Sequence, residues 1–232
     1  MSALLDIRDV AIAFGGVKAL DGVDLQVEPG TITSIFGANG AGKSTLFNIL
    51  TGYLRPDRGE LRFNGAALGT GHPVRAAKAG IGRTWQSPRV FKDMSVLENL
   101  LVAGGQRTPI GQWHKLLFGQ VLHDAVETKA RRWLAFVGLE AQADEAAGAL
   151  SFGQQKLLSI AMLLMTDARL LVLDEPFAGL APRMVRHISE VLLNLRTEGH
   201  AILLVEHNVA EATRISDETF VLEEGRLKPC TP

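Results

Sequence analysis

The chain has 232 residues, of which 47% are hydrophobic, so it can bury a sizeable core as one large α/β domain or two small ones. This composition excludes a largely disordered chain, and a net charge of -1 gives no electrostatic reason to expect nucleic acid or an anionic membrane surface as the main partner. The one cysteine, Cys230, cannot form an internal disulfide, which fits a reducing compartment.

The sequence contains no stretch that suits a signal peptide or a membrane helix. Charges interrupt the first nine residues, where a signal peptide needs an apolar core. The longest largely apolar run, residues 157–165, is far shorter than the roughly 20 residues of a membrane helix. We therefore expect a cytoplasmic protein that, if it works at a membrane, does so from the side.

The N-terminal region predicts a small β layer. Residues 4–14 alternate as a strand does, and residues 17–27 form a second extended segment that we expect to break at Asp21-Gly22. Phe14 ends the first strand just before a Gly-Gly turn. Its ring either stacks on a base or belongs to the core, and the residues alone leave both possibilities open.

The next stretch matches the phosphate-loop pattern G-x-x-x-x-G-K-[ST] at every fixed position. Residues 31–36 have the β-branched and aromatic content of a strand, and residues 45–50 predict a helix. Such a strand–loop–helix unit turns backbone N–H groups into one concavity that suits a polyphosphate. The alternative is a glycine-rich turn between two core elements. The candidate site residues here are Gly37, Asn39, Gly40, Ala41, Gly42, Lys43, Ser44 and Thr45.

The middle third differs in character from its flanks. A short strand at residues 60–65, a helix at 73–79 and a strand at 81–86 that ends on Gln86 come first. The capping box Ser95 to Glu98 then predicts a helix to about Ala103, followed by a glycine-rich loop and a helix over about 121–137. We therefore expect one domain, with a helical subdomain (87–166) inserted into an α/β core (1–86 and 167–232).

The last third predicts alternating helices and buried strands. A second capping box, Ser151 to Gln154, opens a helix to Met165, and the apolar run 170–173 ends in Asp174 and Glu175. A helix over 182–199, a buried strand over 201–205 ending in Glu206-His207, and a hairpin over 219–227 follow. Ligands of open α/β sheets bind outside the carboxyl ends of the strands, which places Asp174 and Glu175 beside the phosphate loop rather than in an exposed turn.

Together these residues resemble the ATP-binding cassette (ABC) family along essentially the whole chain. The segment from Leu150 to Gln155 is similar to the family signature L-S-G-G-Q and lies just upstream of the strand that ends in Asp174. The other matching positions are Phe14 (the aromatic that stacks on adenine), Gln86 (the Q-loop), Glu175 (the catalytic carboxylate), Ala178 to Ala181 (the D-loop) and His207 (the switch histidine).

The resemblance implies an α/β fold, a P-loop NTPase core with a mostly parallel sheet, an N-terminal antiparallel β layer and an inserted α-helical subdomain. It also implies hydrolysis of ATP with Mg²⁺. Lys43 would hold the β- and γ-phosphates, Glu175 would polarise the attacking water and His207 would contact the γ-phosphate. The implied metal ligands are Ser44, Gln86 and Asp174, the last through a bound water. Ser151, Gly153 and Gln154 would complete the nucleotide site of a second cassette.

Within the family, the segment from Arg83 to Phe91 is most similar to the cassettes of branched-chain amino acid importers. Cassettes of urea or amide importers and of lipopolysaccharide export are the alternatives. A soluble cassette ATPase of DNA repair or translation would need a long coiled-coil insertion or two cassettes in one chain, and a P-loop kinase would not explain residues 150–155. The implied partners are integral membrane permease subunits, which place the chain on the inner face of the membrane, and a second ATPase subunit, non-identical in this branch.

Two details depart from the family pattern. The D-loop commonly carries Asp or Asn where this chain has Ala181, and the chain stops at Pro232, earlier than most members of the branch.

The segment near Gln86 has the composition of a protein contact, because Trp85, Val90 and Phe91 offer apolar anchors among basic residues. We expect this segment to contact the membrane partner, and the alternative is that Trp85 and Phe91 are core residues.

Overall fold

The computed structural model describes residues 3–105, 112–207 and 209–230. The chain divides into two compact units. The first, called the core unit here, consists of Met1–Gln86, Arg169–Gly179 and Val185–Pro232, and the second, the helical unit, consists of Ser87–Ala168 and Leu180–Met184. The helical unit is an insertion in the chain of the core unit. It also includes the five residues Leu180–Met184, at the beginning of helix α6 (Pro182–Thr197).

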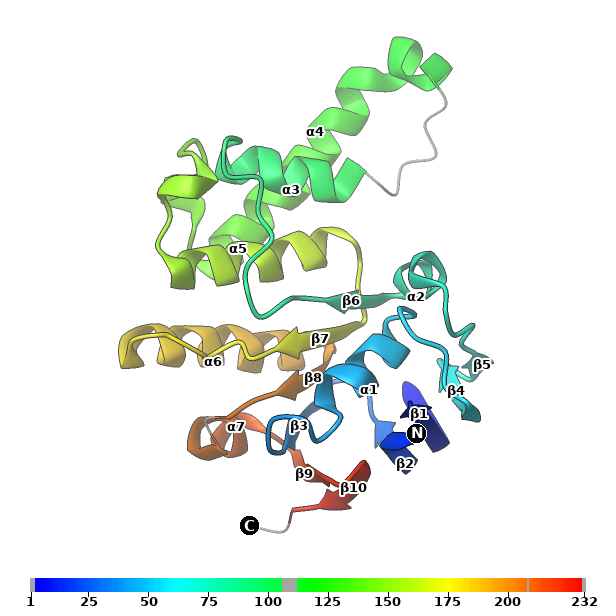
Figure 1. Cartoon of the computed structure of the whole chain (residues 1–232). Helices are drawn as coiled ribbons and strands as arrows, with labels where there is room; N and C mark the ends of the chain where they lie inside the picture. The colour runs from blue at the N-terminus through cyan, green and yellow to red at the C-terminus, as the bar shows by residue number, and fades with distance from the viewer. Residues whose placement is uncertain (1–2, 106–111, 208, 231–232) are drawn as a thin grey trace. The chain divides into compact units, whose positions relative to one another are not determined.

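The N-terminal part of the core unit is an antiparallel sheet with the strand order β2-β1-β4-β5 (Figure 1). Its strands are β1 (Leu5–Phe14), β2 (Val17–Val27), β4 (Arg58–Phe63) and β5 (Ala66–Ala67). In β1 the buried positions Leu5 and Ile7 alternate with more exposed ones until Asp9, whose φ of 46° marks a bulge. After the bulge the buried face continues at Val10 and Ile12, because one extra residue shifts the alternation.

The second sheet is the parallel sheet expected from the sequence, with the order β10-β9-β3-β8-β7-β6. All neighbouring strands are parallel except the C-terminal hairpin β9–β10. Strands β3, β7 and β8 are buried almost throughout, as their unbroken apolar sequences predict. The bounds are β3 (Ile32–Phe36), β6 (Ile81–Arg83), β7 (Leu170–Asp174), β8 (Ala201–Val205), β9 (Glu218–Glu223) and β10 (Arg226–Pro229).

The helices of the core unit are α1 (Lys43–Leu50), α2 (Pro73–Ala79), most of α6 (Pro182–Thr197) and α7 (Val209–Ile215). One hydrophobic core joins α1 to both sheets, with Phe47 completely buried among residues of β1, β3 and β8. The apolar stripe predicted on α6 is buried from Val185 to Leu195. Helix α7 was not expected from the sequence, because seven residues with only two buried side chains leave almost no periodic pattern.

The helical unit contains α3 (Val96–Gly105), α4 (Gln112–Val137), α5 (Phe152–Met165) and two 3-10 turns, Glu140–Gln142 and Ala147–Ala149. Both expected capping boxes are present: Ser95 exchanges hydrogen bonds with Glu98, and Ser151 does so with Gln154.

Two expectations about this unit are wrong in extent. Helix α3 continues through Gly104 and Gly105, which were assigned to a loop, and α4 begins at Gln112 rather than near Val121. Gly104 has a packing role, since a Cβ there would lie 2.6 Å from the Cε of Met165 on α5. The rest of the expected loop, which includes Pro109, falls within residues 106–111 and lies outside the described residues.

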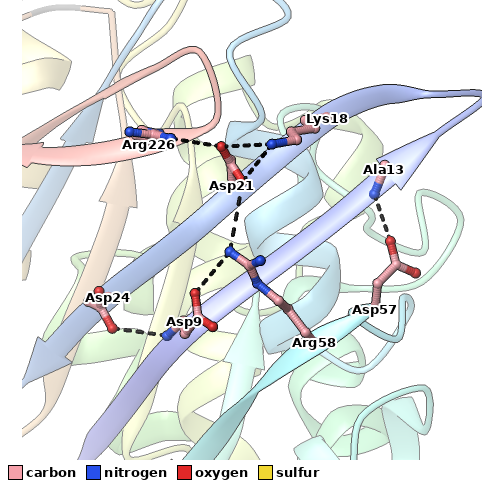
Figure 2. A network of polar contacts seen from close by, with 8 residues as sticks. All are labelled: Asp9, Ala13, Lys18, Asp21, Asp24, Asp57, Arg58 and Arg226. Atoms are coloured by element: carbon pink, nitrogen blue, oxygen red, sulfur yellow. Dashed lines mark hydrogen bonds and ion pairs between the residues drawn. The ribbon is translucent and has the colours of Figure 1, made fainter.

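A polar network ties the middle of β2 to the turn between β9 and β10 (Figure 2). The Asp21 carboxylate accepts hydrogen bonds from Arg226 at 3.0 Å and Lys18 at 3.2 Å, and these bonds, from Arg226 first, lower the pKa of Asp21. The Asp21 amide donates to the carbonyl of Gly225 at 2.8 Å. The predicted break at Asp21-Gly22 is present only as an irregularity: β2 remains one strand from Val17 to Val27, but its register with β1 shifts between Val23 and Leu20.

Candidate functional site

Three strands of the parallel sheet, β3, β8 and β7, end side by side where the candidate residues gather. The register pairs Ile35 of β3 with Val205 of β8, and Val205 with Asp174 of β7, so the carboxyl ends of these strands share one edge. The phosphate loop follows β3, Glu175 follows β7, and His207 comes two residues after β8. This edge is the place where open α/β sheets bind ligands.

The phosphate loop keeps its shape because other backbone segments approach it closely. Gly42 has a φ of 107° and precedes α1, and a Cβ there would lie 2.4 Å from the carbonyl oxygen of Ala19. At the other end of the loop, a Cβ on Gly37 would lie 2.5 Å from the carbonyl oxygen of Leu222. A side chain at either position would push the loop away from β2 or β9, so both glycines are required by packing.

The loop borders open space rather than packed core. Asn39 and Gly40 are exposed, as is Ser44 in the first turn of α1, whereas Ala41 and Thr45 are half-buried. A pocket of about 600 Å³ lies between the loop and the C-terminal hairpin. It is lined by residues 37–41, Val221, Leu222, Glu223, Glu224 and Lys228.

Lys43 is folded back over the loop that precedes it. Its side chain is largely buried, and Nζ donates to the carbonyl oxygens of Gly37 at 2.6 Å and Ala38 at 2.8 Å. Burial lowers the pKa of Lys43, and the nearby carboxylates of Glu175 and Asp174 oppose that shift. The ammonium group is therefore held at the mouth of the phosphate loop, facing the two carboxylates from β7.

Three of the site residues predicted from the sequence, Glu175, His207 and Gln86, meet at the carboxylate of Glu175. One carboxylate oxygen lies 3.0 Å from Nε2 of His207, and the other accepts a hydrogen bond from Nε2 of Gln86 at 2.8 Å. The backbone of Glu175 has a φ of 49°, a left-handed conformation that is uncommon for a side chain of this size. Such strain persists where the surroundings enforce it, and it concentrates at functional sites.

Gln86 lies farther from its strand than the sequence suggested. Strand β6 ends at Arg83, so Thr84 to Gln86 form an extended connection that reaches across to Glu175. Strand β6 lies at the edge of the sheet and pairs only with β7. This pairing ends where Arg83 lies opposite Val172, so the chain is free to leave the sheet before Gln86.

Arg83 is a site residue that the sequence analysis missed. Its side chain is 6% exposed, and its guanidinium donates to Asp174 at 2.9 Å and to Asn48 of α1 at 2.6 Å. The same group lies over the ring of Trp85, 4.3 Å from the ring centre. Arg83 thus fixes one oxygen of Asp174 and leaves the other for a ligand. A basic residue at the end of a buried strand was the available signal.

Glu206 is the second missed residue. It is 2% exposed, and its carboxylate accepts hydrogen bonds from the backbone amides of Phe177 and His207. The signal was the same as for Asp174 and Glu175, because Glu206 directly follows an apolar strand.

The remaining candidates are placed as follows. Phe14 is 49% exposed, so the alternative of a core residue is wrong, while its contact with a base stays a prediction. In the helical unit, Ser151 and Gln154 form the N-terminal cap of α5, and the ring of Phe152 is 45% exposed. Gly153 is buried, and a Cβ there would lie 2.5 Å from the side chain of Met184, which gives this glycine a packing role as well.

Within the described part of the chain, no group of three or more His, Cys, Asp or Glu side chains could hold a metal ion by itself. Among the same residues, none of the helices combines the length and apolar character needed to cross a membrane.

Comparison with known proteins gives consistent matches over almost the whole chain. The ABC transporter family model matches residues 20–178. The chain is 38% identical over 229 residues to the high-affinity branched-chain amino acid transport ATP-binding protein BraF of Pseudomonas aeruginosa, covering 96% of this chain and 89% of that protein. It is 37% identical over 227 residues to LivG of Escherichia coli, a protein of the same description, with the same coverage.

Solved structures agree with these relatives. The ADP conformation of an ATP-binding cassette of an ABC transporter superimposes with a TM-score of 0.86 at 36% identity, covering 98% of this chain and 90% of the other. A nucleotide-free ATP-binding cassette gives a TM-score of 0.84, also at 36% identity, over 97% of this chain and 89% of the other. With the phosphate loop, the strand-end carboxylates and the capped helix α5 all in place, the chain belongs to the ABC transporter family and is an ATP-binding subunit of such a transporter.

Proposed function

We propose that this ATPase powers the import of branched-chain amino acids. The support is the identity of 36–38% to cassettes that carry this description, over at least 96% of the chain. Import of urea or amides and export of lipopolysaccharide are the alternatives.

Deletion of the gene for this chain should abolish high-affinity uptake of radiolabelled leucine, and the wild-type gene should restore it. A gene carrying Lys43→Ala should not restore it, which separates loss of ATPase function from loss of protein. Normal leucine uptake in the deletion strain, with loss of urea uptake instead, would move the proposal to the urea importers.

The observation that carries the proposed catalytic roles is the meeting of Glu175, Gln86 and His207. The Glu175 carboxylate would accept a hydrogen bond, and then the proton, from a water that lies between it and the γ-phosphate. As the oxygen of the water bonds to the γ-phosphorus and the bond to the β–γ bridging oxygen breaks, negative charge gathers on the phosphate oxygens. Lys43 and the amides of residues 39–45 would stabilise that charge, and His207 would contact the γ-phosphate.

The donors for Mg²⁺ would be the Ser44 hydroxyl and the Gln86 amide oxygen, with Asp174 acting through a metal-bound water. These are hard oxygen ligands of the kind that Mg²⁺ takes together with water and nucleotide phosphates. The fixed orientation of Asp174 by Arg83 fits this use, since it points one oxygen away from the ion pair. When bound, the ion would neutralise charge on the phosphates.

The helical unit would serve a second nucleotide. The N-terminus of α5 carries Ser151, Gly153 and Gln154, and a helix N-terminus favours anionic phosphate. We propose that it faces the ATP of a second, non-identical cassette subunit, so that ATP holds the two subunits together. Ala181, which is exposed at the start of α6, would then offer that partner only a methyl group.

The segment that joins the two units is the proposed contact with integral membrane permease subunits, on the inner face of the cell membrane, and no nucleic acid is involved. In the helical unit Phe91 is 50% exposed, so it is not a core residue, and in the core unit Trp85 is half-buried. The completely buried Asn99 accepts from the amide of Phe91 at 2.8 Å and donates to its carbonyl at 3.1 Å. Two hydrogen bonds from a buried side chain thus hold the backbone of the exposed Phe91.

A charge beside this anchor should uncouple transport from hydrolysis. Val90→Asp would place an unpaired carboxylate in the contact, so leucine uptake should fall by about tenfold or more while the chain, mixed with its partner cassette, hydrolyses ATP at the normal rate. Val90→Thr, which keeps the shape without charge, is the control and should transport normally. Unimpaired uptake by a folded Val90→Asp protein would rule out this docking segment.

A further inference from the structure

Glu206 is an unusual residue for the interior of this protein. Its side chain is almost completely buried at the end of β8, where a carboxylate loses its hydration. Such a loss is costly unless hydrogen-bond donors replace the water. One carboxylate oxygen accepts from the amide of Phe177 at 2.6 Å, and the other accepts from the amide of His207 at 3.0 Å. These two short bonds supply the replacement.

The two amides belong to different loops. Phe177 lies two residues after Glu175 in the loop that follows β7, and His207 follows β8. A single carboxylate therefore links the loop of the proposed water-activating residue to the loop of the proposed phosphate contact. The side chains of Glu175 and His207 meet at 3.0 Å on the open side, so Glu206 forms a second, buried link between the same loops.

A carboxylate is the side chain that this arrangement requires. The amides of Phe177 and His207 are both N–H donors, and an ionised carboxylate offers an acceptor to each of them. A glutamine would have to direct its own N–H group toward one of the two amides, or turn away from both. The link also helps to explain how Glu175 keeps its φ of 49°, because a strained backbone persists only where surrounding bonds hold it.

We propose that Glu206 is a positioning residue that sets the separation and orientation of Glu175 and His207 for ATP hydrolysis. This inference rests on the proposed roles of Glu175 and His207. Because the side chain of Glu206 is almost completely buried, we expect its loss to affect the chemical step and to leave nucleotide binding intact.

The test is Glu206→Gln in the full chain, assayed by steady-state ATP hydrolysis in the presence of the partner cassette and by binding of a fluorescent ATP analogue to the purified chain. We expect kcat to fall at least tenfold, since a misplacement of about 1 Å at a reacting group can cost about 100-fold. The KM for ATP and the affinity for the analogue should stay within about twofold, because the phosphate loop keeps its contacts. A kcat within twofold of wild type, or a parallel loss of kcat and analogue affinity, would overturn the proposal.

Two further variants guard against a trivial result. If Glu206→Gln does not fold, Glu206→Asp keeps the charge but cannot reach both amides, and the same selective loss of kcat is expected. Asp217→Asn is the matched control: Asp217 also accepts a backbone amide, that of Ile32 at 2.8 Å, but at the opposite end of the strands. It should lower Tm without changing kcat, and a reduced kcat in this control would count against a specific role for Glu206.

The outcome for Glu175 separates this inference from the proposed function. If Glu175→Gln abolishes hydrolysis and Glu206→Gln does not reduce it, the positioning role alone fails. If Glu175→Gln hydrolyses ATP normally, the proposed catalytic role fails and takes the positioning role with it.

Discussion

Replacement of Glu175 by glutamine should lower the rate of ATP hydrolysis by at least about 100-fold, the usual contribution of a positioned general base. Glutamine keeps the size of the side chain and can still contact His207 and Gln86, but it cannot accept a proton from water. ATP should therefore bind with normal affinity, and because it is no longer turned over, the ATP-bound dimer should accumulate.

Phosphate release measures the rate, and size-exclusion chromatography with Mg-ATP measures the dimer. Glu218→Gln is a suitable control, because Glu218 is an exposed carboxylate at the start of β9, at the other end of the sheet from the site. Hydrolysis at the normal rate by a folded Glu175→Gln protein would refute the role of Glu175 in activating water. If the dimer formed only when a second cassette protein was added, the proposal of non-identical subunits would be supported.

Replacement of Lys43 by alanine should weaken ATP binding by roughly 10- to 100-fold, since hydrogen bonds to charged groups contribute about 1.5–3 kcal/mol. The fold should tolerate the change. Burial lowers the pKa of Lys43, which means that the folded protein disfavours the charge, so its removal offsets part of the cost of the two lost hydrogen bonds to Gly37 and Ala38.

Isothermal titration with ATP and a thermal melt test both halves of this expectation. Lys78→Ala, at the exposed end of α2, is the matched control and should bind ATP like the wild type. Wild-type ATP affinity in a folded Lys43→Ala protein would contradict the assignment of the phosphate loop.

Much of the site could be predicted from the sequence because its key residues stand at the ends of regular elements. The strand before the phosphate loop and the apolar run before Asp174 both have sequence patterns that place their ends at one sheet edge. The signature helix could be located for a similar reason, since Ser151 and Gln154 form a local capping box that depends on no distant contact.

The rest depends on tertiary contacts that no local pattern records. Helix α3 continues through Gly104, beside Met165 of α5, although glycine itself disfavours a helix. Arg83 and Glu206 support Asp174 and the Glu175 loop from other strands, so their roles become visible only once the strands are paired. Gln86 and His207, which lie close to them in the sequence, were identified by resemblance to the family. Such a resemblance identifies the residues of a motif but not the residues that position them.

The contacts around the phosphate loop bear on how this nucleotide site could be reused in protein engineering. The octapeptide from Gly37 to Ser44 is backed by the carbonyls of Ala19 on β2 and Leu222 on β9. Those two strands come from opposite ends of the chain and are joined through Asp21 and the β9–β10 turn. A graft of the octapeptide alone into another α/β scaffold would lack the two strands that contact the loop. The smallest transplantable module therefore includes segments from both ends of the chain.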